Sequence, residues 1–335
     1  MERYTGQPIA ANARIALIAN DAIGMFVVVT PLLRMIRRQF PGAHVTLFTG
    51  TRVQEFTDKS DLADETVFLL GGAMPEWIAL GAGPGYDLVL NTEQSTIAKF
   101  MAMALVTPSG FVAGPCVRAD GRGDWEYPSD ARGDLWRDQD WISPKITDKY
   151  PFLRTPWIVE IFARLFSLEG PVPGYEIPAG KPEVATPQIL LNTGASLESK
   201  LWTPEKWVAL TQWLHARGKS IGLIGAPPST AALHWKGGNV DDTILATGFV
   251  QDLRGKYSLP GVVGAVDAAE AVVSLDNGIM HLAAFRETPV VGLFREGIHR
   301  LWAPPADNVR VLIPPAGKLP AEITVESVQQ ELAHV

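Results

Sequence analysis

The sequence has 335 residues, of which 47% are hydrophobic and 19% are charged, and its formal net charge is −7. This length predicts two domains of an ordinary globular kind, and the acidic balance argues against nucleic acid as a general partner. The single cysteine, Cys116, excludes a disulfide and a cysteine-based zinc site within one chain, so we expect a cytoplasmic protein.

In the N-terminal half, short apolar segments alternate with helical ones. The predicted strands are Ile15 to Ala19, His44 to Phe48, Asp87 to Leu90 and Gly110 to Ala113, and the predicted helices are Met25 to Phe40 and Gln94 to Leu105. This alternation is typical of a parallel, doubly wound α/β domain, in which ligands bind at the carboxyl ends of the strands.

The first predicted helix ends in three arginines, at positions 34, 37 and 38, which suit the negative end of a helix dipole. They also allow an alternative, a peripheral contact with the acidic cytoplasmic face of the inner membrane. The start of the sequence lacks the basic and apolar regions of a signal peptide. No segment approaches the run of about 20 apolar residues that a membrane span needs.

The segment from Arg118 to Trp141 is rich in Asp, Arg and Trp and has no clean period. Long irregular loops in compact domains are often functional. Trp125 and Arg122 could therefore bind the sugar faces and hydroxyls of an acceptor. The alternative, a surface loop whose aromatic side chains pack inward, is equally compatible with the sequence.

The prolines between Pro171 and Pro187 predict a linker, and the second half then repeats the strand and helix rhythm. Strands are predicted near Ile189 and at Ile221 to Ile224, Ala271 to Leu275 and Val290 to Phe294, and a C-terminal helix at Val325 to Val335. The predicted domains are residues 1–170 and 188–322, joined by the linker 171–187 and followed by the helix in 323–335.

Two loops in the second half have the character of an anion-binding pocket. The first follows the strand near Ile189 and offers small side chains, hydroxyls and approachable backbone N–H groups, followed by a lysine and a tryptophan: Thr193, Gly194, Ala195, Ser196, Lys200 and Trp202. Next, Thr203-Pro204-Glu205 predicts a helix start, and the helix should run to about Arg217 before Gly218.

The second loop follows the strand Ala271 to Leu275 and comprises Asp276, Asn277 and Gly278, with His281 in the first turn of the next helix. A helix N-terminus can hold a phosphate, and Asp276 could accept hydrogen bonds from sugar hydroxyls or cap the helix. Two such loops in one half predict a nucleoside-diphosphate site. The chain contains neither a G-x-G-x-x-G dinucleotide turn nor a P-loop.

Several segments together resemble glycosyltransferase family nine, the ADP-heptose:lipopolysaccharide heptosyltransferases. Asn192 to Trp202 is similar to the family's PGAS…SKRWP motif, Ser274 to Ala284 to its D-[ST]-G-P-M-H-L-A motif, and Asp252 to Leu259 to its L-x-G-K-T-S-L motif. Thr288 to Phe294 and Asp21 to Pro41 resemble two further family segments.

The resemblance implies the GT-B architecture, two Rossmann-like doubly wound domains facing one another across a cleft. The N-terminal domain would bind the acceptor and the C-terminal domain the nucleotide sugar, and the C-terminal helix would pack back on the N-terminal domain. It also implies inversion at the anomeric carbon in a single displacement, without a metal or another cofactor. ADP-heptose is the default donor and a bacterial surface glycan or glycoconjugate the acceptor.

The chain departs from the family at the expected catalytic base. The family has an aspartate immediately after the glycine of the N-terminal motif, whereas here Gly24 is followed by Met25, and a thioether cannot take up a proton. Asp21 is the first substitute candidate, with capping of the following helix as its alternative role, and Glu93 is the second. Gly24 and Met25 themselves are expected near the acceptor. A non-catalytic nucleotide-sugar-binding relative is the alternative to an active transferase.

A second departure follows Phe294, where the family continues with a glycine and this chain has Arg295. An arginine there could bind a phosphate of the donor bidentately. It could equally pair with the neighbouring Glu296.

Overall fold

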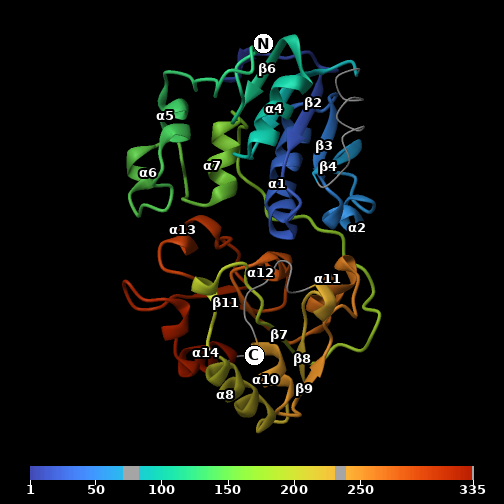
Figure 1. Cartoon of the computed structure of the whole chain (residues 1–335), viewed down its shortest axis with the longest axis vertical. Helices are drawn as coiled ribbons and strands as arrows, with labels where there is room; N and C mark the ends of the chain where they lie inside the picture. The colour runs from blue at the N-terminus through green and yellow to red at the C-terminus, as the bar shows by residue number, and fades with distance from the viewer. Residues whose placement is uncertain (71–82, 231–238, 334–335) are drawn as a thin grey trace. The chain divides into compact units, whose positions relative to one another are not determined.

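The computed structural model describes residues 1–70, 83–230 and 239–333 (Figure 1). The chain divides into two compact units, Met1–Glu176 (unit 1) and Ile177–Val335 (unit 2). The division falls inside the predicted linker 171–187. None of the helices in these described ranges combines the length and apolar character that crossing a bilayer requires.

Unit 1 contains a six-stranded parallel sheet with the order β1-β6-β5-β2-β3-β4. Its strands are β1 (Glu2–Arg3), β2 (Arg14–Ile18), β3 (His44–Gly50), β4 (Glu65–Leu70), β5 (Tyr86–Asn91) and β6 (Val106–Ala113). From β2 the chain adds β3 and β4 on one side and then returns to add β5 and β6 on the other. The order therefore reverses between β2 and β5, which is where doubly wound sheets bind ligands.

The described helices of unit 1 lie around this sheet (Figure 1). They are α1 (Ile23–Gln39), α2 (Gln54–Thr57), α4 (Thr96–Leu105), α5 (Ala131–Arg137), α6 (Ile146–Lys149) and α7 (Ile158–Leu165), with a 3₁₀ turn at Thr51–Val53. Helix α1 packs beside α7, whereas α4 packs on β2, β5 and β6. Apolar runs in β2 and α1 are buried almost throughout, as expected of a central strand and the helix that covers it.

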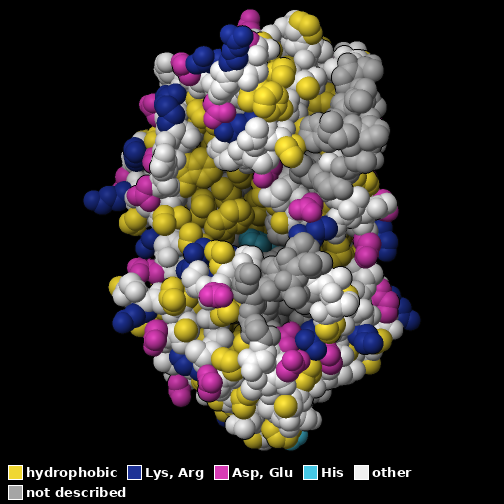
Figure 2. Space-filling model, viewed as in Figure 1, with side chains coloured by type: hydrophobic (Ala, Val, Ile, Leu, Met, Phe, Trp, Pro, Cys, Tyr) yellow, Lys and Arg dark blue, Asp and Glu magenta, His cyan; other side chains and the backbone are white. Residues whose placement is uncertain are grey.

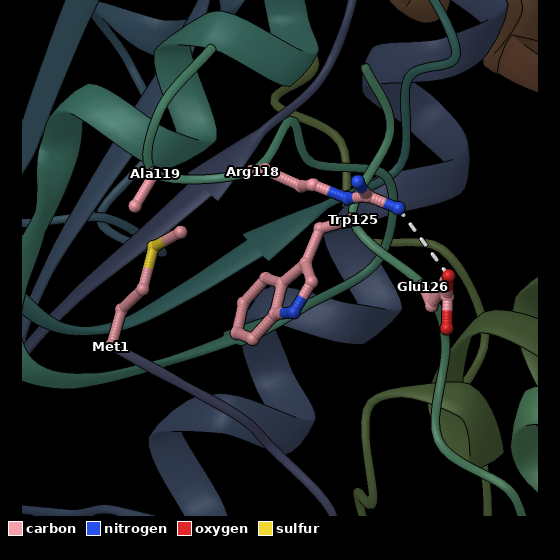
Figure 3. A pocket seen from close by; sticks show the side chains of 5 residues that line it. All are labelled: Met1, Arg118, Ala119, Trp125 and Glu126. Atoms are coloured by element: carbon pink, nitrogen blue, oxygen red, sulfur yellow. Dashed lines mark hydrogen bonds and ion pairs between the residues drawn. The ribbon is translucent and has the colours of Figure 1, made fainter. Parts of the chain in front are cut away.

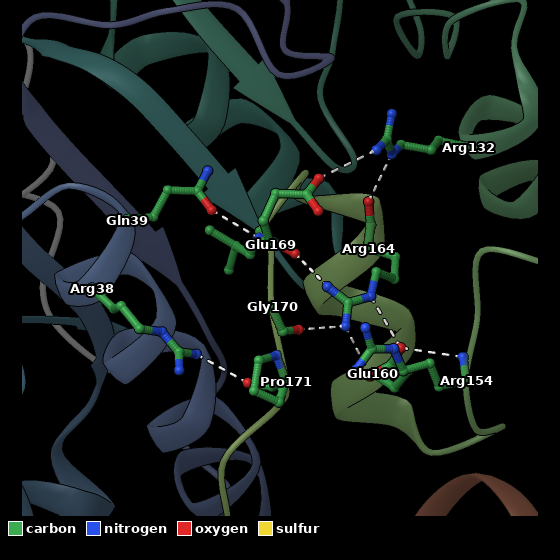
Figure 4. A network of polar contacts seen from close by, with 10 residues as sticks. Arg38, Gln39, Arg132, Arg154, Glu160, Arg164, Glu169, Gly170 and Pro171 are labelled. Carbon is green, nitrogen blue, oxygen red and sulfur yellow. Dashed lines mark hydrogen bonds and ion pairs between the residues drawn. The ribbon is translucent and has the colours of Figure 1, made fainter.

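A buried ion pair fixes the C-terminal end of α7 (Figure 4). Arg164 Nε donates to Glu160 Oε1 at 3.0 Å, and the two side chains are only 9% and 4% exposed. The same guanidinium donates to the carbonyls of Leu168 (2.6 Å) and Gly170 (2.7 Å), so it ties α7 to the segment that follows it. Arg38 of α1 holds the next residue, Pro171, through its carbonyl at 3.0 Å.

The remaining arginines at the end of α1 are also engaged inside unit 1. Arg34 pairs with Glu176 at 2.9 Å and donates to the Gly174 carbonyl at 2.9 Å. Arg37 pairs with Asp64 at 2.8 Å. The basic end of α1 therefore anchors neighbouring segments of its own unit. On the face shown in Figure 2, positive and negative side chains are interspersed over both units.

Unit 2 contains a second six-stranded parallel sheet, with the order β12-β11-β10-β7-β8-β9. Its strands are β7 (Ile189–Asn192), β8 (Ile221–Leu223), β9 (Val250–Asp252), β10 (Ala271–Leu275), β11 (Val290–Leu293) and β12 (Val309–Leu312). In chain order this is the 3-2-1-4-5-6 arrangement of a Rossmann fold, which reverses between β7 and β10.

The helices of unit 2 form two groups. They are α8 (Pro204–His215), α10 (Val240–Leu245), α11 (Leu259–Ala268), α12 (Gly278–Ala283), α13 (Ile298–Trp302) and α14 (Val325–Leu332), with 3₁₀ turns at Glu198–Lys200 and Pro320–Glu322. Helix α8 packs against α10, α14 and β8, whereas α12 packs on α11, β10 and β11. Alternate strand residues, such as Ile189 and Leu191, share one core with α8, α10 and α14.

The predicted C-terminal helix exists, but its apolar face packs elsewhere than expected. Val328 and Leu332 of α14 are buried in the core of unit 2, beside the side chains of α8. The prediction that this helix packs back on the N-terminal domain is therefore wrong for its apolar face. A helix of this length has one apolar stripe, and its own unit already covers that stripe.

Candidate active site

The two loops predicted to bind an anion meet at the point where the strand order of unit 2 reverses. Asn192, the last residue of β7, is paired with Ser274 near the end of β10. The loop after β7 and the loop after β10 therefore leave the same edge of the sheet side by side. Parallel strands bring their carboxyl ends to one edge, and this reversal is the usual place for a nucleotide.

Asn277 joins the two loops. Its Nδ2 donates to the Gly194 carbonyl at 2.6 Å and to Asn192 Oδ1. Its Oδ1 accepts from the N–H of Ile279 at 2.9 Å and contacts the N–H of Met280, which makes Asn277 the N-cap of α12. Asn277, and not Asp276, is therefore the capping residue. The Asn277 oxygen already accepts from these two N–H groups. At the start of α12, the N–H of Gly278 is therefore the one left for a ligand.

Lys200 and Asp276 form a largely buried ion pair at the same edge. Lys200 Nζ lies 2.8 Å from Asp276 Oδ2 and donates to the Asp276 carbonyl at 3.0 Å. The side chains are 16% and 6% exposed. The first loop thus contributes a lysine, the second an aspartate, and each holds the other in place.

His281 lies one turn into α12 and is 3% exposed. Burial lowers its pKa from the ordinary value of 6.5 to about 4, although the Asp276 carboxylate acts in the opposite direction. The imidazole is therefore neutral near neutral pH. Its ring lies edge to face with Trp302 of α13, with 6.3 Å between ring centroids. A neutral, packed imidazole can orient a ligand but carries no charge for a phosphate.

The lowered pKa of His281 predicts acid sensitivity. Because the folded-state pKa of about 4 lies below the unfolded value of 6.5, the unfolded chain binds more protons between these two values. The contribution of His281 to the free energy of unfolding is complete above about pH 6.5. The free energy of unfolding should fall by roughly 2 to 3 kcal/mol as the pH drops towards 4. Urea unfolding at several pH values should show a smaller fall for His281→Gln. Parallel curves for the two proteins would contradict the assignment.

Thr193 is held by residues that the sequence analysis did not single out. Its hydroxyl donates to Asp241 at the start of α10, and Asp241 also pairs with Arg254 at 2.9 Å. Arg254 is bound bidentately to Asp252, at 2.9 and 2.8 Å. Arg254 and Asp252 lie in the segment Asp252 to Leu259, DLRGKYSL. Their charges in this segment could have marked them as candidate site residues. Asp241 gave no signal, because nothing local links it to Thr193.

The other residues of the first loop divide into surface and core. Gly194 is half-buried and Ser196 is exposed, so both can offer backbone groups to a ligand. Ala195 is buried in the core, which leaves only its backbone for binding. Trp202 is 1% exposed, and its indole N–H donates to the Ile323 carbonyl at 2.8 Å. Its predicted contact with the donor is therefore wrong, since Trp202 packs edge to face on Trp207 inside the core.

Arg295 follows β11, the strand beside β10. Its Nε is buried and has no hydrogen-bond partner, and the guanidinium forms no ion pair, within the described part of the chain. The alternative pairing with Glu296 is not formed there, since the Glu296 carboxylate accepts from the Gly317 N–H at 3.0 Å. Arg295 is thus a cation without a counter-ion in this part of unit 2.

In unit 1, the two candidate bases lie at the corresponding reversal of strand order. Asp21 follows β2, and its carboxylate is 40% exposed and 4.0 Å from Arg52. The N-cap of α1 is Ala22, without a side-chain cap, so the alternative capping role of Asp21 is excluded. Glu93 follows β5, and its Oε1 accepts from Asn20 Nδ2 at 3.1 Å. Because β2 and β5 are paired neighbours, with Ile18 opposite Asn91, the structure places both candidate residues after the same edge of the sheet.

Among the residues that the structure describes, no hydrogen bond joins the predicted acceptor residues to one another. Met25 is 6% exposed in α1, which leaves little of its side chain for an acceptor, and Gly24 is half-buried. Arg122 is exposed on a turn in which its N–H donates to Asp120 at 2.9 Å. In the described ranges, neither Arg122 nor Trp125 hydrogen-bonds to Asp21 or Glu93.

Most aromatic residues of the segment 118–141 pack inward. Tyr127 stacks on Trp136 at 5.3 Å between ring centroids, and Trp141 packs on Trp136 and Phe162. The alternative of an inward-packed surface loop is therefore confirmed for these three aromatic residues.

Trp125 is the exception in this segment. One face of its ring is covered by the Arg3 guanidinium at 4.2 Å, and the ring also borders a shallow hollow of about 470 Å³ with Met1, Arg118, Ala119 and Glu126 (Figure 3). In Figure 3 the Trp125 ring points towards Met1, while Arg118 turns towards Glu126. This hollow is open, and neither Asp21 nor Glu93 is among the residues that line it.

The described residues contain no group of three His, Cys, Asp or Glu side chains that could hold a metal ion.

Comparison with known proteins shows which family the C-terminal part of the chain resembles. Residues 173–330, which include both loops, match the model of glycosyltransferase family 9 (heptosyltransferase). A curated relative, lipopolysaccharide heptosyltransferase 3 of Escherichia coli, is 27% identical over 118 residues, which is 33% of this chain and 32% of that protein. The matched part thus spans about a third of that relative. The predicted resemblance to the family is confirmed, and the family and this relative are glycosyltransferases.

Solved structures extend the likeness of fold to nearly the whole chain. A glycosyl transferase family 9 protein from Veillonella parvula has a TM-score of 0.73 at 15% identity, covering 97% of this chain and 98% of that one. The E. coli ADP-heptose lps heptosyltransferase II has a TM-score of 0.69 at 18% identity, covering 96% and 98%. The predicted fold class, two doubly wound α/β domains of GT-B type, is confirmed.

Proposed function

We propose that this protein is an inverting glycosyltransferase of the heptosyltransferase type. It would move a sugar, heptose by default, from a nucleoside-diphosphate sugar, ADP-heptose by default, to a hydroxyl of a bacterial surface glycan such as lipopolysaccharide. The observation that carries the proposal is the junction of the two loops of unit 2. Lys200, Asp276 and Asn277 meet at the reversal of the Rossmann sheet, inside the segment that matches the family model.

The chemistry of these residues suits a departing nucleoside diphosphate. Lys200 would exchange part of its contact with Asp276 for phosphate oxygens, and the backbone at Gly194, Ser196 and Gly278 would donate hydrogen bonds. Asp276 would then be free to accept from sugar hydroxyls. These charges and donors stabilise the negative charge that develops on the leaving group, so the proposal needs no metal ion.

Arg295 would supply the second positive charge for the donor. Its guanidinium has no counter-ion among the described residues and its Nε is buried, which suits an anionic group, and arginine binds phosphate bidentately. Arg295→Gln should weaken nucleoside-diphosphate binding by about 1.5–3 kcal/mol, the range for hydrogen bonds to charged groups. Arg310 of β12, whose ion pair with Glu331 is partly exposed, offers the control Arg310→Gln. Equal affinities for wild type and Arg295→Gln would remove Arg295 from the site.

The function is tested by calorimetric binding of ADP, UDP and GDP with and without magnesium, followed by turnover of the donor that corresponds to the tightest nucleotide. Metal-independent preference for ADP, with sugar transfer to a lipopolysaccharide-core acceptor, is the expected result. Preference for another base would change the donor and keep the reaction class. Binding without any donor consumption would favour the alternative, a non-catalytic relative that has lost the family's base at Met25.

We propose the cytoplasm as the place of action, where nucleotide sugars are available. The arginines of α1 give little support to a peripheral membrane contact. Each of Arg34, Arg37 and Arg38 is engaged by groups of unit 1. Each free basic residue near an anionic lipid surface contributes about 1 kcal/mol to binding. Flotation with vesicles that contain anionic lipid should therefore leave the protein unbound.

A further inference from the structure

We infer that Glu93 is the catalytic base of the transfer and that Asn20 is its positioning residue. This inference rests on the proposed function. The family position for the base is occupied by Met25, which cannot take up a proton. The carboxylate must therefore come from elsewhere in the chain, and two are available where the strand order of unit 1 reverses.

Glu93 has one oxygen held and the other open. Its Oε1 accepts from Asn20 Nδ2 at 3.1 Å, while Oε2 has no hydrogen-bond partner in the part of the chain that the structure describes. The backbone of Glu93 is fixed as well, because its N–H donates to Asn91 Oδ1 at 2.8 Å and its carbonyl accepts from Asn91 Nδ2 at 3.1 Å. A base needs this combination of a fixed position and a free lone pair.

The orientation of the Asn20 amide follows from its own contacts. Asn20 Oδ1 accepts from the N–H of Ala22 at 2.8 Å, and a backbone N–H can only donate. The oxygen of the amide must therefore face Ala22, and the nitrogen must face Glu93. Asn20 thereby connects the loop after β2 to the loop after β5, across the reversal of the sheet.

Thr92 gives Glu93 a second neighbour. Its hydroxyl donates to the Ile18 carbonyl at 2.9 Å and lies 3.3 Å from Glu93 Oε1. A hydroxyl has one hydrogen, so the shorter contact with Ile18 holds it most of the time. Thr92 then mainly fixes the strand ends, and Asn20 remains the principal donor to the carboxylate.

Asp21 lacks this support. Its carboxylate accepts no hydrogen bond from the described residues, and its nearest ionic neighbour is Arg52 at 4.0 Å. An exposed carboxylate on a loop must be ordered anew each time it reacts, whereas Glu93 is already ordered. Geometry thus reverses the order of the two candidates that the sequence suggested.

The step itself is a single displacement. The acceptor oxygen attacks the anomeric carbon of the donor sugar as the bond from that carbon to the diphosphate oxygen breaks, and the diphosphate leaves with the electron pair. Glu93 Oε2 takes the proton of the acceptor hydroxyl and later returns it to solvent. Oε1 keeps its hydrogen bond from Asn20 throughout.

The first test compares Glu93→Gln with the matched variant Asp21→Asn. General-base catalysis contributes about 100- to 10,000-fold, so Glu93→Gln should lower kcat by that factor while the Kd for the nucleoside diphosphate stays unchanged. Asp21→Asn should stay within a few-fold of wild type. Formate should partly restore kcat in Glu93→Ala, because a small carboxylate can enter the space left by the side chain.

The second test addresses Asn20. Asn20→Ala should lower kcat with little change in either KM, and the double variant Asn20→Ala/Glu93→Gln should be no slower than Glu93→Gln alone. Residues that act through one another show such non-additivity, whereas a merely structural role of Asn20 would slow the double variant further.

The outcomes separate this inference from the proposed function. If wild-type protein transfers sugar and Glu93→Gln retains its kcat, Glu93 is not the base and the function stands. If Asp21→Asn alone abolishes transfer while nucleotide binding persists, Asp21 is the base. If wild-type protein binds donor and transfers nothing to any acceptor, the proposed function itself fails.

Discussion

Lys200→Ala is expected to damage both stability and nucleotide binding. The substitution leaves the Asp276 carboxylate, with its side chain 6% exposed, without its ionic partner. Breaking a buried ion pair by removing one member costs about 3–5 kcal/mol of stability. If Lys200 also contacts the diphosphate, its loss should weaken binding by a further 1.5–3 kcal/mol, or about 10- to 150-fold in Kd. Denaturant unfolding and calorimetry measure the two effects separately.

A double variant separates these two roles of Lys200. In Lys200→Ala/Asp276→Asn the buried carboxylate is neutralised, so most of the lost stability should return. The lost affinity should not return, because the cation is still absent. Recovery of both properties would mean that Lys200 only stabilises Asp276 and does not bind the donor.

A matched control comes from a second lysine pair of unit 2. Lys219 pairs with Glu270 at partly exposed positions near Gln188, at the opposite end of β7 from the donor loop. Exposed pairs contribute about 0–1 kcal/mol, so Lys219→Ala should change stability little and nucleotide affinity not at all. Loss of binding in this control would show that the assay reports general destabilisation.

The sequence predicted the sheets well because their strands are buried runs of apolar residues. The predicted strand Ala271 to Leu275 coincides with β10. The predicted strand Val290 to Phe294 coincides with β11 but extends one residue beyond its end. The strands that were missed lie mainly at sheet edges, such as β9, in which Gln251 and Asp252 are exposed, and β12. Edge strands need only partial apolar character, so their sequences resemble loops.

Helix ends were predicted where a local signal exists. Thr203 caps α8 as expected, with Pro204 at the first position, because both effects involve neighbouring residues. The other end was predicted at about Arg217, but α8 ends at His215, and Gly218 takes a left-handed φ of 72° three residues later. A glycine after a helix shows reliably where the chain changes direction, but it shows less reliably which residue is the last of the helix.

The site shows the same division between local and long-range information. The two donor loops could be found from sequence because glycines, small residues and a lysine follow buried strands. The pairing of Lys200 with Asp276, and of Asn277 with Asn192 and Gly194, joins residues far apart in the chain. Trp202 was misassigned for the same reason, because only the fold brings the Ile323 carbonyl to its indole N–H.

Arg164→Met is expected to destabilise unit 1 as strongly as Lys200→Ala destabilises unit 2. It leaves Glu160, 4% exposed, without a counter-ion, and it removes the donors to the Leu168 and Gly170 carbonyls. The expected loss is about 3–5 kcal/mol, measured by urea unfolding. Arg118→Met, at the exposed pair with Glu126, should cost no more than about 1 kcal/mol.

Neutralising Glu160, the partner of Arg164, tests whether the unpaired buried charge causes the loss of stability in Arg164→Met. Arg164→Met/Glu160→Gln should recover much of the stability, because a buried neutral amide costs less than a buried charge and can still accept from the Arg154 N–H. If the double variant is as unstable as Arg164→Met, the two lost carbonyl contacts and not the ion pair hold α7 in place. Because Arg164 lies outside the candidate site, its variants should bind nucleoside diphosphate with wild-type affinity wherever they remain folded.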